Sequence, residues 1–95
     1  MLFRSDALRL VGVARAALGE HALARTALDR AVELAEAGES LLIVAEAYEA
    51  RARLAADLGD RPTARHEAAL ALARLRELGA ADDVVRLEAW VATLG

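Results

Sequence analysis

Apolar residues recur along this chain at intervals of three and four, the spacing that places side chains on one face of an α-helix. Isolated glycines interrupt the pattern, and glycine readily adopts the left-handed conformation that ends many helices. The pattern predicts five helices, over about residues 5–18, 20–37, 40–58, 60–78 and 82–94. Because the loops between them are short, consecutive helices should form antiparallel hairpins.

Capping residues predict where these helices begin and end. Short polar side chains accept hydrogen bonds from the free N–H groups of a first helical turn. The predicted N-caps are Ser5 or Asp6, Ser40, Asp60 and Asp82. The glycines predicted to end helices are Gly19, Gly38, Gly59 and Gly79.

The composition favours closely packed helices. Of the 95 residues, 25 are Ala and 17 are Leu, and alanine combines high helix propensity with little bulk between helix axes. The expected core positions include Leu28, Ala31, Leu34, Ala35, Leu54, Ala55, Leu58, Ala64, Ala68, Ala71, Leu75 and Leu78. Since no alternating apolar and polar run reaches the length of a strand, the expected fold is all-α, in one domain over residues 1–95.

Charge and cysteine content narrow the classes of function. The net charge is −3, and the twelve Arg are interspersed with acidic residues, so nucleic-acid binding is not expected. Lys, Asn, Gln and Cys are absent, a bias typical of a GC-rich bacterial coding sequence. The apolar runs, such as residues 41–45, are at most six residues long, which is too short for a signal peptide or a membrane span. We therefore expect a cytoplasmic protein.

Two stretches of the chain share one pattern. Residues 11–24 and 51–64 each contain a helical run, Leu-Gly, an acidic residue, two variable residues, a spacer and Ala. In this pattern the chain resembles the tetratricopeptide repeat, a helix-turn-helix unit of 34 residues. The signature positions are filled by Leu8, Val11, Gly12, Gly19, Ala24, Leu28, Ala31 and Leu34 in the first repeat, and by Tyr48, Ala52, Gly59, Ala64, Ala68 and Ala71 in the second. In the second repeat Arg51 takes a position that is usually apolar.

The resemblance implies an architecture and a class of function. It implies a short α-solenoid of stacked hairpins, with repeats over about residues 5–38 and 40–79 and a capping helix over about 82–94. Repeats of this kind bind partners more often than they catalyse reactions. The end of the chain is also similar to the helical-repeat regions of bacterial signalling and transcriptional regulators. We therefore expect a protein-interaction module, with small-effector sensing and homodimerisation as alternatives.

The family's binding surface is the concave face formed by the first helix of each hairpin. The resemblance places Asp6, Arg9, Val13, Glu46, Glu49, Arg53, Asp82 and Val85 on this face. Because two glutamates lie in its middle, the expected partner is a protein or peptide, either basic or an amphipathic helix with a basic flank.

A second candidate surface concerns self-association. Leu41, Leu42, Ile43 and Val44 are four consecutive large apolar residues, more than a two-helix contact can cover. Phe3 and Trp90 are further candidates for such a contact. Together they indicate a possible homodimer.

No catalytic or metal site is expected. His66-Glu67 begins like a zinc-protease helix, but Leu70 stands where the second metal-binding His is needed. The carboxylates are spaced for ion pairs along a helix, such as Glu49 with Arg53 and Asp82 with Arg86. We therefore expect no enzyme activity and no cofactor.

Overall fold

Helices make up the fold, and no strand occurs in the part of the chain that the structure describes. The structure is a computed structural model that describes residues 4–38 and 40–95. Its helices are α1 (Arg4–Ala17), α2 (His21–Gly38), α3 (Leu41–Asp57), α4 (Arg61–Leu78) and α5 (Ala81–Ala92). The expected all-α fold with five helices is confirmed for these residues.

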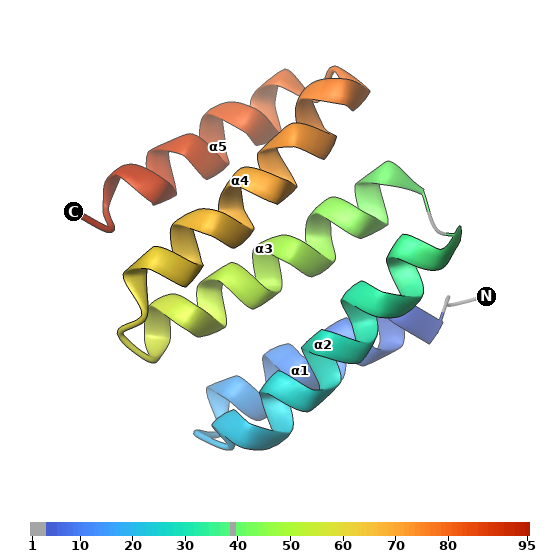
Figure 1. The fold of residues 1–95 in the computed structure, drawn as a ribbon, viewed down its shortest axis with the longest axis vertical. Helices are drawn as coiled ribbons and strands as arrows, with labels where there is room; N and C mark the ends of the chain where they lie inside the picture. The colour runs from blue at the N-terminus through green and yellow to red at the C-terminus, as the bar shows by residue number, and fades with distance from the viewer. Residues whose placement is uncertain (1–3, 39) are drawn as a thin grey trace.

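Consecutive helices pack side by side and run antiparallel (Figure 1). The helices α2, α3, α4 and α5 follow one another in this order, while α1 lies behind α2 and also contacts α3. The molecule is flat, with extents of 34 × 31 × 17 Å. Helix α3 therefore occupies the middle of the molecule and has neighbours on several sides.

Three of the turns between helices share one glycine motif. Gly19, Gly59 and Gly79 have φ angles of 79°, 80° and 72°, in the left-handed region that other residues rarely adopt. After each glycine, the next N–H donates to the carbonyl five residues earlier, at 2.9 to 3.0 Å. This is the Schellman arrangement that closes a helix. The predicted role of these three glycines is confirmed.

Two predicted N-caps are also confirmed. The N–H of Ile43 donates to the Ser40 hydroxyl at 3.4 Å, at the start of α3. The N–H of Thr63 donates to the Asp60 carboxylate at 3.2 Å, at the start of α4. This hydrogen bond holds the pKa of Asp60 below its usual value.

Other predicted helix ends are wrong. Gly38 is the last residue of α2 and does not adopt the left-handed conformation, because the helix continues through it. Ser5 and Asp6 are not caps, because α1 already includes Arg4 and places both in its first turn. Asp82 likewise lies in the first turn of α5, where its negative charge still complements the helix dipole.

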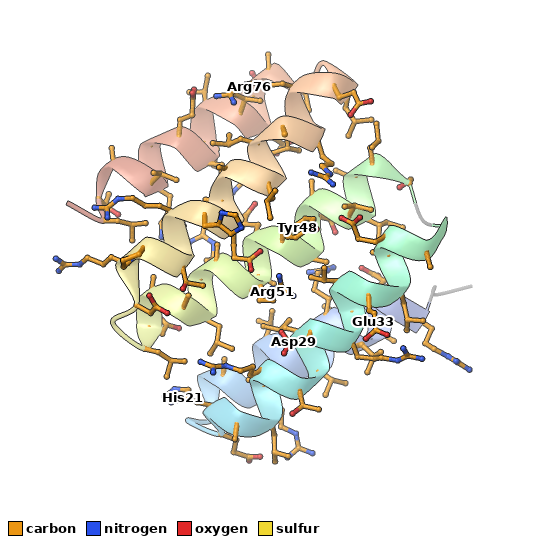
Figure 2. The ribbon with its side chains drawn as sticks, in the orientation of Figure 1. His21, Asp29, Glu33, Tyr48, Arg51 and Arg76 are labelled. Atoms are coloured by element: carbon orange, nitrogen blue, oxygen red, sulfur yellow. The ribbon has the colours of Figure 1, made fainter. Side chains whose placement is uncertain are left out.

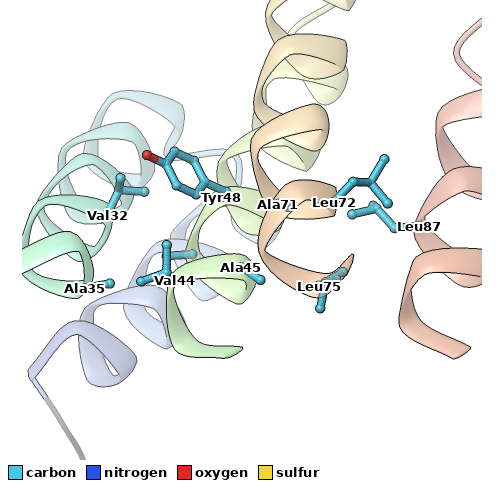
Figure 3. Packing of buried hydrophobic residues seen from close by; sticks show 10 residues of the cluster. Val32, Ala35, Val44, Ala45, Tyr48, Ala71, Leu72, Leu75 and Leu87 are labelled. Atoms are coloured by element: carbon cyan, nitrogen blue, oxygen red, sulfur yellow. The ribbon is translucent and has the colours of Figure 1, made fainter. Parts of the chain in front are cut away.

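The main core joins α2, α3, α4 and α5 (Figure 3). Tyr48 of α3 lies near Val32 of α2, and Leu72 of α4 lies against Leu87 of α5. Two smaller clusters lie beside the last turns of α3, one shared with α1 and α2 and the other with α4, α5 and the end of the chain. The structure confirms burial at most of the predicted core positions. These are Leu28, Ala31, Ala35, Leu54, Ala55, Ala64, Ala68, Ala71 and Leu75. Leu34 is partly buried, whereas Leu58 and Leu78 are exposed because they lie at helix ends.

The apolar run at the start of α3 is mostly covered within the chain. Val44 is buried, Ile43 packs against the main core and Leu41 is partly buried. Of the four residues, Leu42 is the exposed one. The central position of α3 gives three of these side chains neighbours on more than one face, and self-association through this turn stays a prediction. Phe3 lies outside the described residues.

Candidate functional site

A groove of about 260 Å³ opens between α1, α3 and α5. Its lining residues are Arg9, Val13, Glu46, Glu49, Ala50, Arg53 and Arg86. These residues come from α1, α3 and α5, which were predicted as the first helices of successive hairpins. The three helices are far apart in the sequence. The structure thus brings five of the eight residues predicted on the concave face, Arg9, Val13, Glu46, Glu49 and Arg53, into one groove. Asp6 does not line the groove itself but pairs with Arg9, which does.

Ion pairs connect the three helices across this groove. Arg9 of α1 lies 2.8 Å from Asp6 and 3.3 Å from Glu46 of α3. Arg86 of α5 donates from both terminal nitrogens to the two oxygens of Glu49, at 2.8 and 2.9 Å. Such a two-bond pair fixes the orientation of both side chains. Glu46 and Glu49 therefore tie α3 to α1 and to α5.

The glutamates of the groove are consequently not free to attract a basic partner. Besides Arg86, Glu49 accepts a hydrogen bond from Arg53 at 3.1 Å, the predicted pair along the helix. The lining contains both predicted glutamates and three arginines, so cations outnumber anions in the groove. The third arginine, Arg86 of α5, was not predicted on this face.

Arg53 is held in place on one wall of the groove. Its guanidinium group lies over the Trp90 ring, 4.6 Å from the ring centre, a distance typical of a cation–π contact. Its Nε donates to Glu49, and within the described residues its two terminal nitrogens have no hydrogen-bond partner. Trp90 itself is partly buried and packs against two apolar clusters. Arg53 is therefore a positioned cation with donors left for a ligand.

Two residues predicted on the concave face lie elsewhere. Val85 is 66% exposed and faces a shallow apolar hollow beside the turn between α4 and α5. Asp82 is exposed and does not line the groove. Arg86 pairs with Asp83 at 3.5 Å and with Glu49, not with Asp82 as predicted. The rotation of α5 about its axis, which turns Arg86 toward α3, explains all three differences.

A second polar network lies between α2 and α4, around Arg51 (Figure 2). Arg51 donates to one oxygen of Glu67 from two nitrogens, at 2.6 and 3.0 Å, and lies 3.4 Å from Asp29. The Glu67 side chain is 8% exposed, and its other oxygen is buried without a hydrogen-bond partner among the residues that the structure describes. Because Glu67 compensates its charge, Arg51 can occupy a position where the resemblance to the repeat predicts an apolar residue.

Tyr48 joins the same network. Its hydroxyl donates to Glu36 of α2 at 2.5 Å, and Arg74 of α4 also contacts Glu36 at 3.1 Å. The guanidinium groups of Arg51 and Arg74 lie 5.7 and 5.2 Å from the ring centre of Tyr48. Burial and the Glu36 hydrogen bond raise the pKa of Tyr48. The network links α2, α3 and α4 on the side of α3 that the concave-face prediction did not address.

Comparison with models of known protein families, with curated proteins and with solved structures finds no match. The resemblance to the tetratricopeptide repeat therefore stays a prediction that depends on the residues and spacings given above. None of the helices that the structure describes is long and apolar enough to cross a membrane.

The charge of Glu49 should contribute to stability. Burial alone would raise the pKa of Glu49, but the hydrogen bonds from Arg86 and Arg53 outweigh it and hold the pKa below its usual value. A carboxylate of this kind stabilises the fold fully above its unfolded-state pKa of about 4.3. The contribution is lost as the pH falls through the lower folded-state pKa.

Glu49→Gln is therefore expected to lower the free energy of unfolding by about 1 kcal/mol at pH 7, since the amide accepts weaker hydrogen bonds and the arginines are half exposed. The difference should be smaller at pH 3, because the carboxylate gains protons as the pH falls below about 4.3. Urea unfolding of both proteins at the two pH values measures it, with the exposed Glu33→Gln as a control. A difference of equal size at both pH values would contradict this role of Glu49.

Proposed function

We propose that this chain is a non-catalytic helical-repeat module of the tetratricopeptide type that binds a segment of another protein in the groove between α1, α3 and α5. The observation that carries the proposal is the convergence of side chains from three separate helices on one groove. Repeat proteins commonly bind along such a surface because each unit contributes equivalent positions to it. A place in a bacterial regulatory protein stays a prediction from the resemblance.

The lining indicates the chemistry of the partner. Val13 and Ala50 supply apolar contact area, while Arg53 supplies donors without partners within the described residues. An amphipathic helix fits this combination if its apolar face lies on Val13 and an acidic side chain reaches Arg53. A small effector fits less well, because pockets for such ligands are mostly apolar and enclose about 300 to 1,000 Å³.

A peptide-display selection tests this proposal. The full chain is immobilised and used to select from a library of randomised helical peptides, and the affinity of each selected peptide is measured by fluorescence anisotropy. We expect amphipathic peptides that carry an acidic residue. Binding should weaken at least about tenfold in Arg53→Glu, because one charge-assisted hydrogen bond contributes about 1.5 to 3 kcal/mol.

Leu42→Glu is the control, since it places the same glutamate side chain at an exposed residue that does not line the groove. Selected peptides that bind the Arg53→Glu and wild-type chains equally well would place binding outside the groove. Circular dichroism of each variant separates loss of binding from loss of fold.

A further inference from the structure

Helix α1 carries an apolar face on the side that points away from its own core. This α1 outer face consists of Ala7, Leu10, Val11, Ala14 and Leu18. At 3.6 residues per turn these positions lie on one side of the helix, opposite the buried Ser5 and Gly12. Leu10, Val11 and Leu18 are 48%, 46% and 72% exposed.

No charged residue interrupts the α1 outer face. Asp6 and Arg9 of α1 pair with each other, and Arg9 turns toward the groove, while Arg15 pairs with Glu20 across the turn. A helix at the surface of a soluble domain normally presents polar residues outward, and a helix that is apolar on opposite sides is normally covered on both. The outer face of α1 therefore has the pattern of a contact surface.

The internal repeat shows what such a face does elsewhere in the same chain. Forty residues later, Ala47 and Leu54 of α3 correspond to Ala7 and Ala14 of α1, and both are buried in apolar clusters against neighbouring helices. On α1 the corresponding positions have no such cover in the part of the chain that the structure describes. Two of the five positions are thus used for helix packing once already, whereas Leu58, the counterpart of Leu18, is exposed.

We propose that the α1 outer face pairs with α1 of a second copy of this chain, in an antiparallel dimer with a two-fold axis near residues 12 and 13. This axis sets Leu18 of one copy against Ala7 of the other, and Val11 against Ala14. Each large side chain then faces a small one, and the four positions have the alternating spacing of four and three residues seen in helix pairs.

The charges and the helix direction agree with a second copy as the occupant. Because the face is uncharged, it needs no oppositely charged partner, and an antiparallel pair places the positive end of each helix dipole beside the negative end of the other. The same axis brings Arg4 toward Glu20 of the other copy, which have opposite charges.

The size of the surface sets the expected affinity. A pair of helices of about four turns buries less than the roughly 800 Å² per partner of a standard interface. We therefore expect a dissociation constant on the order of tens of micromolar. The chain should be largely monomeric at about 1 μM and largely dimeric at several hundred μM.

Sedimentation equilibrium across this concentration range tests the proposal. The wild-type mass should rise from 10.1 kDa toward twice that value. Leu18→Glu should weaken the dimer at least about tenfold, because it places a charge in an apolar contact. Leu42→Glu, the same substitution at an exposed leucine of α3, should leave it unchanged. Circular dichroism checks that each variant keeps the wild-type helicity.

Cysteine cross-linking then tests the register, since the natural chain contains no cysteine. Under mild oxidation, a mixture of Val11→Cys and Ala14→Cys chains should form a covalent dimer of the two, whereas each variant alone should cross-link far less. Three outcomes would overturn the proposal: a wild-type monomer at every concentration, a dimer that Leu18→Glu leaves intact, or cross-linking of each cysteine variant chiefly with itself.

Discussion

Replacing Gly12 with leucine is expected to lower the free energy of unfolding by about 3 kcal/mol, the upper range for overpacking a close contact. Gly12 is buried where α1 crosses α2, and a Cβ atom added there would lie 2.5 Å from Cδ2 and 2.6 Å from Cγ of Leu28. Leu28 is itself almost fully buried, so it has little room to move away. Helix α1 must then shift away from α2. Urea unfolding followed by circular dichroism measures the loss.

Gly38→Leu is the matched control for this prediction. Gly38 is also helical, but a Cβ atom added there meets no atom within 4 Å. Leucine has a higher helix propensity than glycine, so this variant should be as stable as the wild type or slightly more stable. If both variants lose the same free energy of unfolding, the close approach of α1 to Leu28 is not the reason for glycine at residue 12.

Arg51→Ala is expected to lower the free energy of unfolding by about 3 kcal/mol. This value is at the low end of the range for breaking a buried ion pair, because Arg51 is itself partly exposed. The variant leaves the Glu67 carboxylate buried without its cation, and the other oxygen of that carboxylate already lacks a partner. The loss should exceed what removal of a surface ion pair causes, which is about 0 to 1 kcal/mol. Urea unfolding at pH 7 measures it.

The double variant Arg51→Leu with Glu67→Leu distinguishes a buried charge from lost packing. Removing both partners also removes the carboxylate oxygen that has no hydrogen bond, and apolar replacements of buried ion pairs are often neutral or stabilising. The double variant should therefore be about as stable as the wild type. If it is as unstable as Arg51→Ala, the arginine stabilises through contacts other than its pair with Glu67.

The sequence was most informative where local chemistry determines the structure. Gly19, Gly59 and Gly79 end helices as predicted, because a left-handed residue after a helix strongly favours glycine. Gly38 has the same sequence context, yet α2 includes it as a helical residue. The difference depends on how far the helix extends, which a single glycine does not determine.

The groove could be predicted only in part, because its remaining features depend on long-range contacts. The helical spacing places Glu46, Glu49 and Arg53 together on α3, but nothing in the local sequence relates Arg86 to Glu49, 37 residues earlier. The preferred local partner of Arg86 was Asp82, one helical turn away. How α5 is rotated against α4 decides between the two pairings.

The apolar surfaces show the same division between local pattern and tertiary structure. Four adjacent apolar residues at the start of α3 indicated an exposed patch, yet the central position of that helix covers most of them. The spacing of Ala7, Val11, Ala14 and Leu18 is visible in the sequence, but spacing alone does not show whether such a stripe faces the core. Which side of α1 faces the core depends on Gly12 and Leu28, which the structure brings together.

The stacking of Arg53 on Trp90 gives this protein an intrinsic optical probe. Trp90 is the single tryptophan of the chain, and its indole ring lies directly beneath a residue that lines the groove. A ligand that draws the guanidinium group away from the ring changes the polarity around the indole, and with it the wavelength and intensity of its emission. Occupancy of the groove can therefore be followed by fluorescence on the unlabelled wild-type chain.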